Sequence, residues 1–577
     1  MRTSHRVSHS SAVLGRALGV VLPLASVLVT LHCVAACGSS ASPGAAPAAT
    51  TPGAPVPVPD AGAPDTPSAP VITMQPGDAM VMAGTTAMFA VTTSGGTAPV
   101  TYQWKRNGVA ISGATSATYT TPATLVSDTG SKYSVDVVNP IATVPSNDAL
   151  LTVIAGAGAW GPVVTISSGD LNSSMQANGA VVAVDSSGAA VATWQQASGA
   201  RNAVWANSAD ATGTWGTAAL IDLPAGGNAT PPRVGMTSSG SAIAVFGQPI
   251  NTMVGQGLVA SRFNGGVWTA AETIVAGDVD SVSSWEAGIA SDGSATATFL
   301  QTDATMKRVR GVRSTSADVW GTPAILDVAG GDVPKLAMGA NGHSVAVWIK
   351  NNGPMVSELW SSHDVGLGFA AASMITMDTS HTNGLEVTAD AAGNVIAVWS
   401  QLGSSGNYVV RSARLDDTTG AWSAPVALSD GTRLATAAKP AVNAKGDAAV
   451  VWYEQGGGLY ASTYGSATAT WTPAVVLPMT VSPTYAAQPT TTIDGAGNAI
   501  AVWLQFVNGA QYPHVFHTIH VAGLGKWTTP ATLMADPTAY CVDAPVVTLN
   551  AKGFATAVWH QLTPSPATAP IVARAYR

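Results

Sequence analysis

Charged residues are scarce in this chain: Asp, Glu, Lys and Arg together make up 10% of its 577 residues, and the net charge is −8. The charges form no acidic or basic run, so nothing indicates nucleic acid or an anionic membrane surface as a partner. Beyond the N-terminus, no stretch approaches the roughly 20 apolar residues that a membrane-spanning helix needs. Short apolar runs bounded by Gly and Pro occur instead, and this pattern is typical of all-β structure.

Residues 1–36 are expected to be an export signal rather than part of the fold. A start containing Arg and His precedes the apolar segment Ala17–Leu31, which is too short to span a membrane comfortably. The segment ends in Val34-Ala35-Ala36-Cys37-Gly38, which resembles the lipobox of bacterial lipoproteins. The resemblance implies lipidation of Cys37, and Gly38 after it implies the outer membrane of a Gram-negative cell. Ordinary secretory cleavage before an incidental cysteine is the alternative.

Only three cysteines occur in the chain. After cleavage Cys37 would be a thioether and Cys541 would be alone, so no intrachain disulfide is expected and stability must come from packing. Cys541 is interpreted as a small, partly buried side chain in a loop. Residues 37–69 consist mainly of Ala, Pro, Ser and Gly, and this composition predicts a flexible tether that forms no core.

Residues 70–154 contain short alternating segments typical of a β-sandwich. With Tyr102-Gln103-Trp104 and the Asp-x-Gly-x-x-Tyr motif ending at Tyr133, the segment resembles bacterial immunoglobulin-like domains. The resemblance implies that Trp104 is the buried core tryptophan and that Tyr133 forms the tyrosine corner. Val135 stands where that family's second cysteine would be, so the family's disulfide is missing. Such a domain serves as a spacer or as an adhesive module.

Residues 155–577 are dominated by an internal repeat. A turn glycine is followed, six residues later, by an aromatic residue in a short apolar strand, and the glycines recur every 49 to 56 residues. A second unit, an aromatic residue followed by small residues and a strand, comes after each of the first seven repeats. Four strands in about 52 residues is the size of one β-propeller blade. The first aromatic series is Trp194, Phe246, Phe299, Trp348, Trp399, Trp452, Trp503 and Trp559.

The strand count predicts how the ring closes. Eight hairpin units are followed by only seven of the second units, and the missing one lies upstream, at Trp160–Ile166. We therefore expect an eight-bladed propeller whose N-terminal strand completes the C-terminal blade, with seven or nine blades if one repeat is misread. The segment Ser208-Ala209-Asp210-Ala211-Thr212-Gly213-Thr214-Trp215 is similar to the Asp-box of sialidase (BNR-like) propellers, with its glycine displaced by one. This resemblance implies fold more than activity.

Residues that recur in every repeat are predicted to be structural, because each blade must pack on the next. This interpretation covers the Gln found two residues after the strand aromatic, which is expected to bond backbone at the strand end. The tryptophans predicted to be structural are Trp104, Trp160, Trp194, Trp399, Trp503 and Trp559.

Binding residues are therefore sought in the unshared loops that meet at one face of the ring. Aromatic rings beside carboxylates and amides suit sugar binding, although they are also ordinary loop residues. No catalytic set, metal-ligand spacing or cofactor motif is found, and the sequence predicts neither a metal nor a cofactor. The candidate ligand-binding residues are Arg233, Asp278, Trp285, Glu286, Asp332, His381, Arg433, Tyr485, Tyr540 and Asp543.

Three functions remain open. The leading one is a lipid-anchored, monomeric cell-surface binding or adhesion protein that presents the propeller loops to a glycan, peptide or protein. The second is a sialidase-like glycoside hydrolase, which would need convergent carboxylates or an arginine cluster such as Arg201, Arg233 and Arg433. The third is a structural component of the outer-membrane envelope. The sequence does not identify the ligand.

Overall fold

The computed structural model describes residues 67–577 except 83–85, 123, 125–127, 155–158, 169–176, 251–254, 277–280, 304–305, 317–318, 328–329, 354–355, 379, 457, 478–485, 507–512, 542 and 565–566. All elements in this part of the chain are β-strands, and none of its segments is a helix that could cross a membrane. The export signal, Cys37 and the tether up to residue 66 lie outside the described residues, as do the candidates Asp278 and Tyr485.

Residues 71–154 form a small β-structure with its own core. Its largest sheet has the order β2-β10-β8-β5-β6, with β9 on β8, and the pairs β1–β4 and β3–β7 form two further sheets. Trp104 is fully buried and donates its indole N–H to Ser116 O at 2.9 Å, while the Tyr133 ring stacks on Phe89 at 4.5 Å. The strands are β1 Val71–Met74, β2 Ala79–Met82, β3 Met88–Ala90, β4 Thr92–Ser94, β5 Thr101–Arg106, β6 Val109–Ala110, β7 Thr118–Thr120, β8 Lys132–Val138, β9 Thr143–Pro145 and β10 Ala149–Ile154.

The rest of the described chain is a β-propeller built from antiparallel sheets, numbered first to eighth in chain order. The first four sheets contain β12 Asn178–Val184, β13 Ala190–Ser198, β14 Arg201–Ala209 and β15 Ala219–Leu220; β16 Arg233–Met236, β17 Ala242–Pro249, β18 Gln256–Asn264, β19 Val267–Trp268 and β20 Glu272–Val275; β21 Ser281–Ile289, β22 Ala295–Asp303, β23 Met306–Arg313 and β24 Ala324–Asp327; and β25 Gly331–Met338, β26 Ser344–Gly353, β27 Val356–Asp364 and β28 Ser373–Asp378.

The fifth to eighth sheets follow the same plan. They contain β29 Thr382–Ala389, β30 Val395–Leu402, β31 Tyr408–Asp416, β32 Ala421–Trp422 and β33 Val426–Ala427; β34 Ala435–Val442, β35 Ala448–Glu454, β36 Gly458–Gly465, β37 Thr470–Trp471 and β38 Val475–Val476; β39 Ala486–Ile493, β40 Ala499–Phe506, β41 Pro513–Val521, β42 Lys526–Trp527 and β43 Ala531–Thr532; and β11 Val164–Thr165, β44 Tyr540–Cys541, β45 Val546–Leu549, β46 Ala555–Pro564, β47 Ala567–Thr568 and β48 Ile571–Tyr576.

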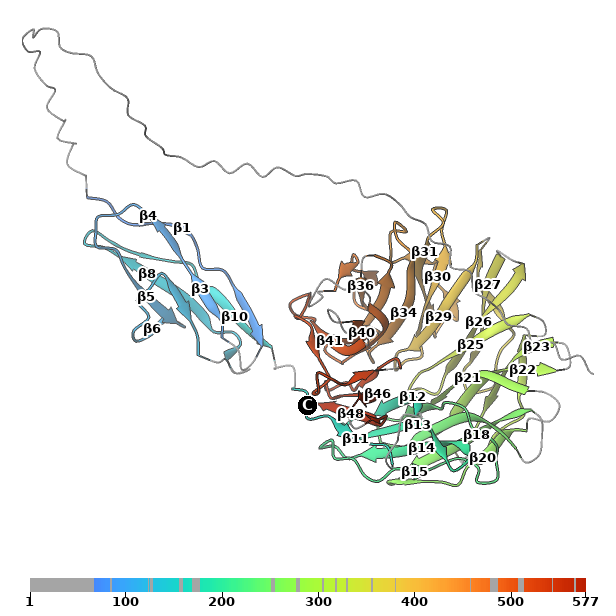
Figure 1. The fold of residues 1–577 in the computed structure, drawn as a ribbon. Helices are drawn as coiled ribbons and strands as arrows, with labels where there is room; N and C mark the ends of the chain where they lie inside the picture. The colour runs from blue at the N-terminus through green and yellow to red at the C-terminus, as the bar shows by residue number, and fades with distance from the viewer. Residues whose placement is uncertain are drawn as a thin grey trace, which may run out of the picture. The chain divides into compact units, whose positions relative to one another are not determined.

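The inner strand is the first strand of each of the first seven sheets, and in the eighth sheet it is β45. These inner strands contact one another in the closed cycle β12, β16, β21, β25, β29, β34, β39, β45 and back to β12. Figure 1 shows the sheets set around a common centre, with β12, β21, β25, β29 and β34 nearest to it. The inner strands therefore form the wall of a central space, and side chains at one level of that wall come from every sheet.

The N-terminal strand of the propeller pairs with its last strand. Val164 and Thr165 of β11 pair antiparallel with Ala573 and Val572 of β48, and Trp160 forms a further bridge to Tyr576. Ile166, just after β11, is 2% exposed and belongs to the core between the eighth and first sheets. The pairing expected from the strand count is thus present, and it leaves β48 without a free edge.

The aromatic residue six positions after each turn glycine is buried, as expected for a position shared by all repeats; it is Phe246 and Phe299 in the second and third sheets and tryptophan in the other six. Trp194, Trp399 and Trp503 are fully buried and Trp559 is 1% exposed. Each lies at an interface between consecutive sheets, where a large apolar ring fills the space between them.

The glutamine two residues after this aromatic has a more specific role than the expected backbone contact. Gln196, Gln505 and Gln561 each accept the indole N–H of the tryptophan two residues earlier, at 2.8, 3.2 and 3.3 Å. Gln196 also donates to the backbone oxygen of Ser168, so the expected contact exists beside the new one. A buried indole N–H needs an acceptor, and a neutral amide supplies it without a buried charge.

Glu454 replaces this glutamine in the sixth sheet, and Glu454→Gln is expected to stabilise the protein at neutral pH. Glu454 is 4% exposed and accepts the Trp452 indole N–H at 3.0 Å. Burial, aided by the Asp430 charge, raises the pKa of Glu454 above its ordinary value despite the opposing effects of Trp452 and Arg433. The folded state therefore favours the protonated acid, and this contribution to stability is lost as the pH rises through the raised pKa. Thermal unfolding should show a higher midpoint for the variant at pH 7, and this advantage should vanish below the ordinary glutamate range. A variant less stable than the wild type at pH 7 would contradict it.

A β-bulge recurs in most inner strands, and one residue of each adopts a positive φ. The fourth sheet has Val333 (φ 48°) at this position, where the fifth has Gly384 (φ 63°), and the pairing register shifts at both. A β-branched residue in this conformation is strained by about 1–3 kcal/mol, whereas glycine adopts it without steric cost.

Val333→Gly is therefore expected to stabilise the protein by about 1 kcal/mol, because the relieved strain exceeds the added chain entropy of glycine. Val333 is 41% exposed, so little packing is lost. The reciprocal variant Gly384→Val should destabilise by a similar amount, since a Cβ there would meet no atom closer than 3.8 Å and only the φ value opposes it. Denaturant unfolding of both variants measures the two changes, and shifts of the same sign would contradict the interpretation.

Candidate functional site

One level of the propeller's inner wall carries an alternating series of charges. Each inner strand contributes one residue to this level. That residue pairs with the residue that comes just before the buried aromatic in the neighbouring strand. Five consecutive sheets place charged residues there, and the other three place Thr490, Val546 and Val181. The inner-wall ion chain, as we call it, consists of Arg233, Glu286, Lys335, Glu386 and Lys439.

Neighbouring members of the inner-wall ion chain are in direct contact. Glu286 Oε2 lies 3.2 Å from Arg233 Nε, and Glu286 Oε1 lies 3.2 Å from Lys335 Nζ. Lys335 Nζ lies 3.2 Å from Glu386 Oε2, and Lys439 pairs with the other oxygen of Glu386. Each carboxylate thus has two cations, while the terminal cations Arg233 and Lys439 have one carboxylate each. The inner-wall ion chain therefore carries three positive charges and two negative ones.

The exposure of the side chains decreases from the two ends of the inner-wall ion chain to its middle. The side chains of Arg233 and Lys439 are each 42% exposed, whereas that of Lys335 is 17% exposed. Burial would lower the pKa of Lys335, but Glu286 and Glu386 outweigh burial and raise it. Burial would raise the pKa of Glu386, but Lys335 and Lys439 outweigh it and lower the value. Lys335 and Glu386 are therefore held in their charged forms, and the exposed excess positive charge lies at Arg233 and Lys439.

Two cavities adjoin the inner-wall ion chain and share Lys335. The first, of about 250 Å³, is lined by Arg233, Trp285, Glu286 and Lys335 together with Pro231 and Ser284. The buried indole N–H of Trp285 has no hydrogen-bond acceptor among the described residues. Arg233 and Lys335 give the first cavity several hydrogen-bond donors, and such a set suits a carboxylate or several hydroxyl oxygens.

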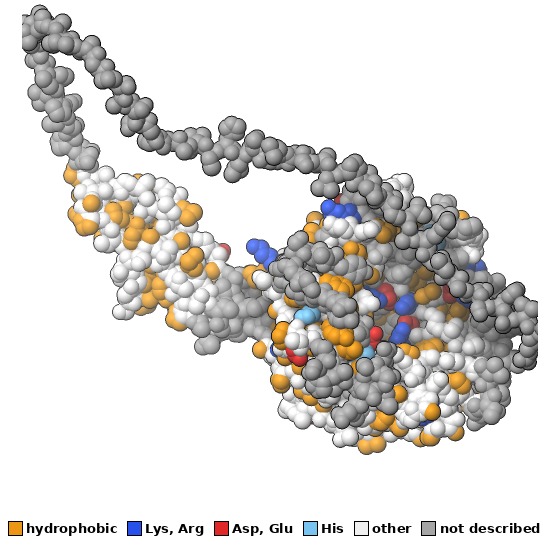
Figure 2. All heavy atoms as spheres, in the orientation of Figure 1, with side chains coloured by type: hydrophobic (Ala, Val, Ile, Leu, Met, Phe, Trp, Pro, Cys, Tyr) orange, Lys and Arg blue, Asp and Glu red, His pale blue; other side chains and the backbone are white. Residues whose placement is uncertain are grey.

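The second cavity, of about 320 Å³, lies between the fourth and fifth sheets. Asp332, Lys335, His381 and Glu386 contribute to its lining. His381 Nδ1 lies 2.8 Å from the hydroxyl of Tyr408, and Asp332 lies 3.4 Å from Lys307 Nζ. Figure 2 shows Lys, Arg, Asp and Glu side chains gathered at the middle of the propeller, among apolar and neutral ones.

The structure thus brings together some of the residues singled out from the sequence. Arg233, Trp285 and Glu286 line one cavity, and Asp332 and His381 line the adjoining one. Arg233, Trp285, Glu286 and Asp332 lie within inner strands, however, whereas the sequence interpretation placed them in loops. Their strands face the central space, so a residue can reach a ligand there without leaving regular structure.

Other candidates lie elsewhere. Arg433 donates to the Tyr460 hydroxyl at 2.6 Å and lines a separate cavity of about 410 Å³. Arg201 is paired with Asp222, and Arg233 and Arg433 line two different cavities. Tyr540 lies in the short strand β44, and Asp543 contacts His560 Nδ1 at 3.4 Å.

Cys541 also differs from expectation, because it lies in strand β44 rather than in a loop and is fully buried. Its Sγ lies 3.0 Å from Asp543 O. The thiol is therefore shielded from solvent in the described structure.

Sequence reasoning missed Lys335, Glu386 and Lys439. A signal was available, because the three residues stand at the register of Arg233 and Glu286 in their own repeats. Aligning the repeats by the strand before each turn glycine would have shown the alternating charges.

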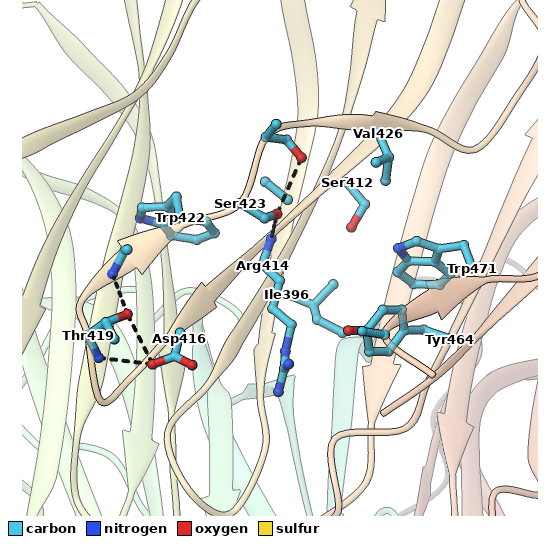
Figure 3. A pocket seen from close by; sticks show the side chains of 14 residues that line it. Ile396, Ser412, Arg414, Asp416, Thr419, Trp422, Ser423, Val426, Tyr464 and Trp471 are labelled. Atoms are coloured by element: carbon cyan, nitrogen blue, oxygen red, sulfur yellow. Dashed lines mark hydrogen bonds between the residues drawn. The ribbon is translucent and has the colours of Figure 1, made fainter. Parts of the chain in front are cut away.

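A larger groove, of about 450 Å³, lies toward the outer edge between the fifth and sixth sheets. Figure 3 shows Trp422, Trp471 and Tyr464 around it, with Arg414 extending between them. The outer aromatics recur in the other sheets and are all half-buried: Trp215, Trp268, Trp320, Phe369 and Trp527. Sheets that radiate from a centre separate toward their outer strands, so a groove of this kind is expected between any two neighbouring sheets. The groove is therefore no evidence for a particular ligand.

Comparison with known proteins gives only distant likenesses. No family model and no curated protein matches the chain. Among solved structures, a protein of unknown function from Dyadobacter fermentans is 13% identical with a TM-score of 0.37, covering 63% of this chain and 98% of that one. NanB sialidase from Streptococcus pneumoniae is 9% identical with a TM-score of 0.34, covering 85% and 90%. A fungal alcohol oxidase in complex with copper is 14% identical with a TM-score of 0.38, covering 70% and 84%. At these values the likenesses carry no argument about activity.

Proposed function

We propose that this chain is an exported, lipid-anchored binding protein of the bacterial cell surface. In this proposal Cys37 carries the lipid, residues 37–69 are the tether, and residues 70–154 are an immunoglobulin-like spacer. The sheets of residues 155–577 are the blades of one eight-bladed propeller. The propeller binds an acidic glycan at its inner wall.

The observation that supports an acidic ligand is the charge pattern of the inner-wall ion chain. Three cations face two carboxylates, and the singly paired Arg233 at one end lines a cavity together with Trp285. A guanidinium binds a carboxylate by charge-assisted hydrogen bonds, and an indole ring offers an apolar face to a sugar ring. A glycan that bears a carboxylate satisfies both groups at once.

The same contacts favour binding over glycoside hydrolysis. A glycosidase needs one carboxyl group that can donate a proton and a second that acts as base or nucleophile. Glu286 and Glu386 are each held between two cations, and the pKa of Glu386 is lowered by Lys335 and Lys439 against the effect of burial. Glu386 is therefore not suited to the acid role. Hydrolysis and a purely structural envelope role are the other outcomes of the test below.

The test is an array of matched acidic and neutral glycans, probed with the full chain and with Arg233→Met. Preferential binding of carboxylate-bearing glycans, weakened at least about tenfold by Arg233→Met, is the expected result. Arg433→Met is the matched control, because Arg433 lines a different cavity, and it should bind like the wild type. Equal binding of neutral glycans, or no binding at all, would refute the proposal. Release of free sugar from bound glycans would favour the hydrolase, and stable co-purification with envelope proteins would favour the structural role.

A further inference from the structure

Three side chains from two neighbouring sheets converge at a place that involves none of the inner-wall residues. His343 lies in the turn between β25 and β26, His363 lies in β27, and Asp417 directly follows β31 of the next sheet. His343 Nδ1 is 2.8 Å from Asp417 Oδ2, and His363 Nε2 is 2.9 Å from Asp417 Oδ1. The potential ligand atoms of the three residues all lie within 4.8 Å of one another.

His363 departs from the repeat at this point. The second, third and fifth sheets have Arg262, Arg313 and Arg414 at the register of His363. Arg262 and Arg313 each donate to the carbonyl of the turn glycine in the following sheet, at 3.0 and 2.7 Å. The fourth sheet replaces this guanidinium–carbonyl link with an imidazole that faces a carboxylate.

His343 departs from the repeat as well. Its register holds Asn394, Asp447 and Asn498 in the fifth, sixth and seventh sheets. Each of these accepts a backbone N–H from its own sheet, at 3.0, 2.9 and 3.1 Å. His343 instead contacts Asp417 of the following sheet. Both histidines therefore lack the contacts made by their counterparts in other sheets, and both contact the same carboxylate.

We propose that His343, His363 and Asp417 bind a divalent metal ion of the zinc class. Two imidazoles and a carboxylate are ligands that zinc prefers, at about 2.0–2.2 Å, so adjacent ligands of a tetrahedral ion lie about 3.4 Å apart. The nitrogen–oxygen distances of 2.8 and 2.9 Å are hydrogen bonds. An outward movement of about half an ångström at each contact brings the three ligands to the separation that the ion needs. The ion ties the fourth sheet to the fifth and leaves coordination positions open.

The surroundings fit such a site. The side chains of His343, His363 and Asp417 are 29%, 18% and 10% exposed, so the ion is reachable from solvent yet partly shielded. Asn394 Oδ1 accepts the backbone N–H of Asp417 and helps to hold that residue in position. Support of a ligand by a second hydrogen-bonded residue is a regular feature of metal sites.

The test is titration of the untagged full chain, stripped of metal by chelator and desalted, with Zn²⁺ and with Co²⁺. We expect one ion per chain at micromolar concentration, visible Co²⁺ absorption from nitrogen and oxygen ligands, and a rise in the unfolding temperature with Zn²⁺. His343→Gln and His363→Gln should each weaken binding at least about tenfold. His381→Gln, which changes a histidine bonded to Tyr408 instead, should retain full affinity.

A second measurement needs no variant. Zn²⁺ should protect His343 and His363 of the wild-type chain from acylation by diethyl pyrocarbonate, located by mass spectrometry, and should leave His381 reactive. Absence of Zn²⁺ binding at micromolar concentration would overturn the proposal and leave a hydrogen-bonded His–Asp–His cluster. Unchanged affinity in the His343→Gln/His363→Gln double variant, or no protection of either histidine, would overturn it equally.

Discussion

Deletion of residues 155–168 is expected to abolish the cooperative unfolding of the propeller, although it removes only one short strand. The deletion exposes the edge of β48 and removes Ile166, which is 2% exposed, from the core between the eighth and first sheets. It also removes the backbone bonds from Gly161 N to Ala575 O and from Ile166 N to Ile571 O, at 2.8 and 2.9 Å. Losses of this size are comparable with the whole stability of a domain, about 5–15 kcal/mol.

A milder variant separates ring closure from simple truncation. Ile166→Asp places a charge in the same core and should destabilise the propeller by about 3 kcal/mol or more. Val164→Asp is the matched control on β11, because Val164 is 37% exposed, and its cost should stay below about 1 kcal/mol. Thermal and denaturant unfolding of the full chain provide the comparison. An unchanged transition after the deletion would show that β11 does not close the ring.

Lys335→Met is expected to destabilise the protein by about 3–5 kcal/mol, the range found when one partner of a buried ion pair is removed. Lys335 is the only cation between Glu286 and Glu386 in the inner-wall ion chain, and its side chain is 17% exposed. Without it, each glutamate keeps one cation while remaining mostly buried. Lys307→Met is the control, because Lys307 is 53% exposed and its contact with Asp332 is a surface pair that contributes little.

The pH dependence of this effect identifies its cause. Burial opposes the charged form of Glu386, but Lys335 and Lys439 lower its pKa below the ordinary value, so Glu386 stabilises the fold at neutral pH. This contribution is lost as the pH falls through the lowered pKa. The stability difference between wild type and Lys335→Met should therefore be largest near pH 7 and smaller in acid. A difference that is constant with pH would indicate lost packing instead of lost ion pairing.

Much of the fold could be inferred from residue spacing alone. The interval between turn glycine and aromatic predicted the strand pairs, and the surplus unit at Trp160 predicted the partner of the last strand. Both patterns were visible because every repeat packs in the same way and therefore shows the same residues at the same spacing. The role of Gln196 was only partly predicted, since its distance from the indole of Trp194 depends on side-chain conformation. The conformation of Val333 could not be predicted, because a bulge is set by the pairing partner and not by the residue itself.

Less of the two candidate sites could be predicted from the sequence. Arg233 and Glu286 were noticed because they interrupt an apolar pattern, but their assignment to loops was wrong, since charged residues rarely lie in inner strands without partners. Lys335, the partner of Glu286, lies in the next sheet, and no spacing within one repeat relates the two residues. His363 and Asp417 are likewise 54 positions apart, so the search for metal-ligand spacing found nothing. Such groups meet only when consecutive sheets are placed side by side.

Hydrogen–deuterium exchange of the full chain, with and without the glycan that it binds best, tests the proposed binding site most directly. The inner strands have one edge directed at the central space, so their exposed amides should report a ligand bound there. We expect slower exchange in β16, β21 and β25, with no change around Trp422 and Trp471 in the outer groove. Protection confined to the outer groove, or absent from the inner strands, would contradict it.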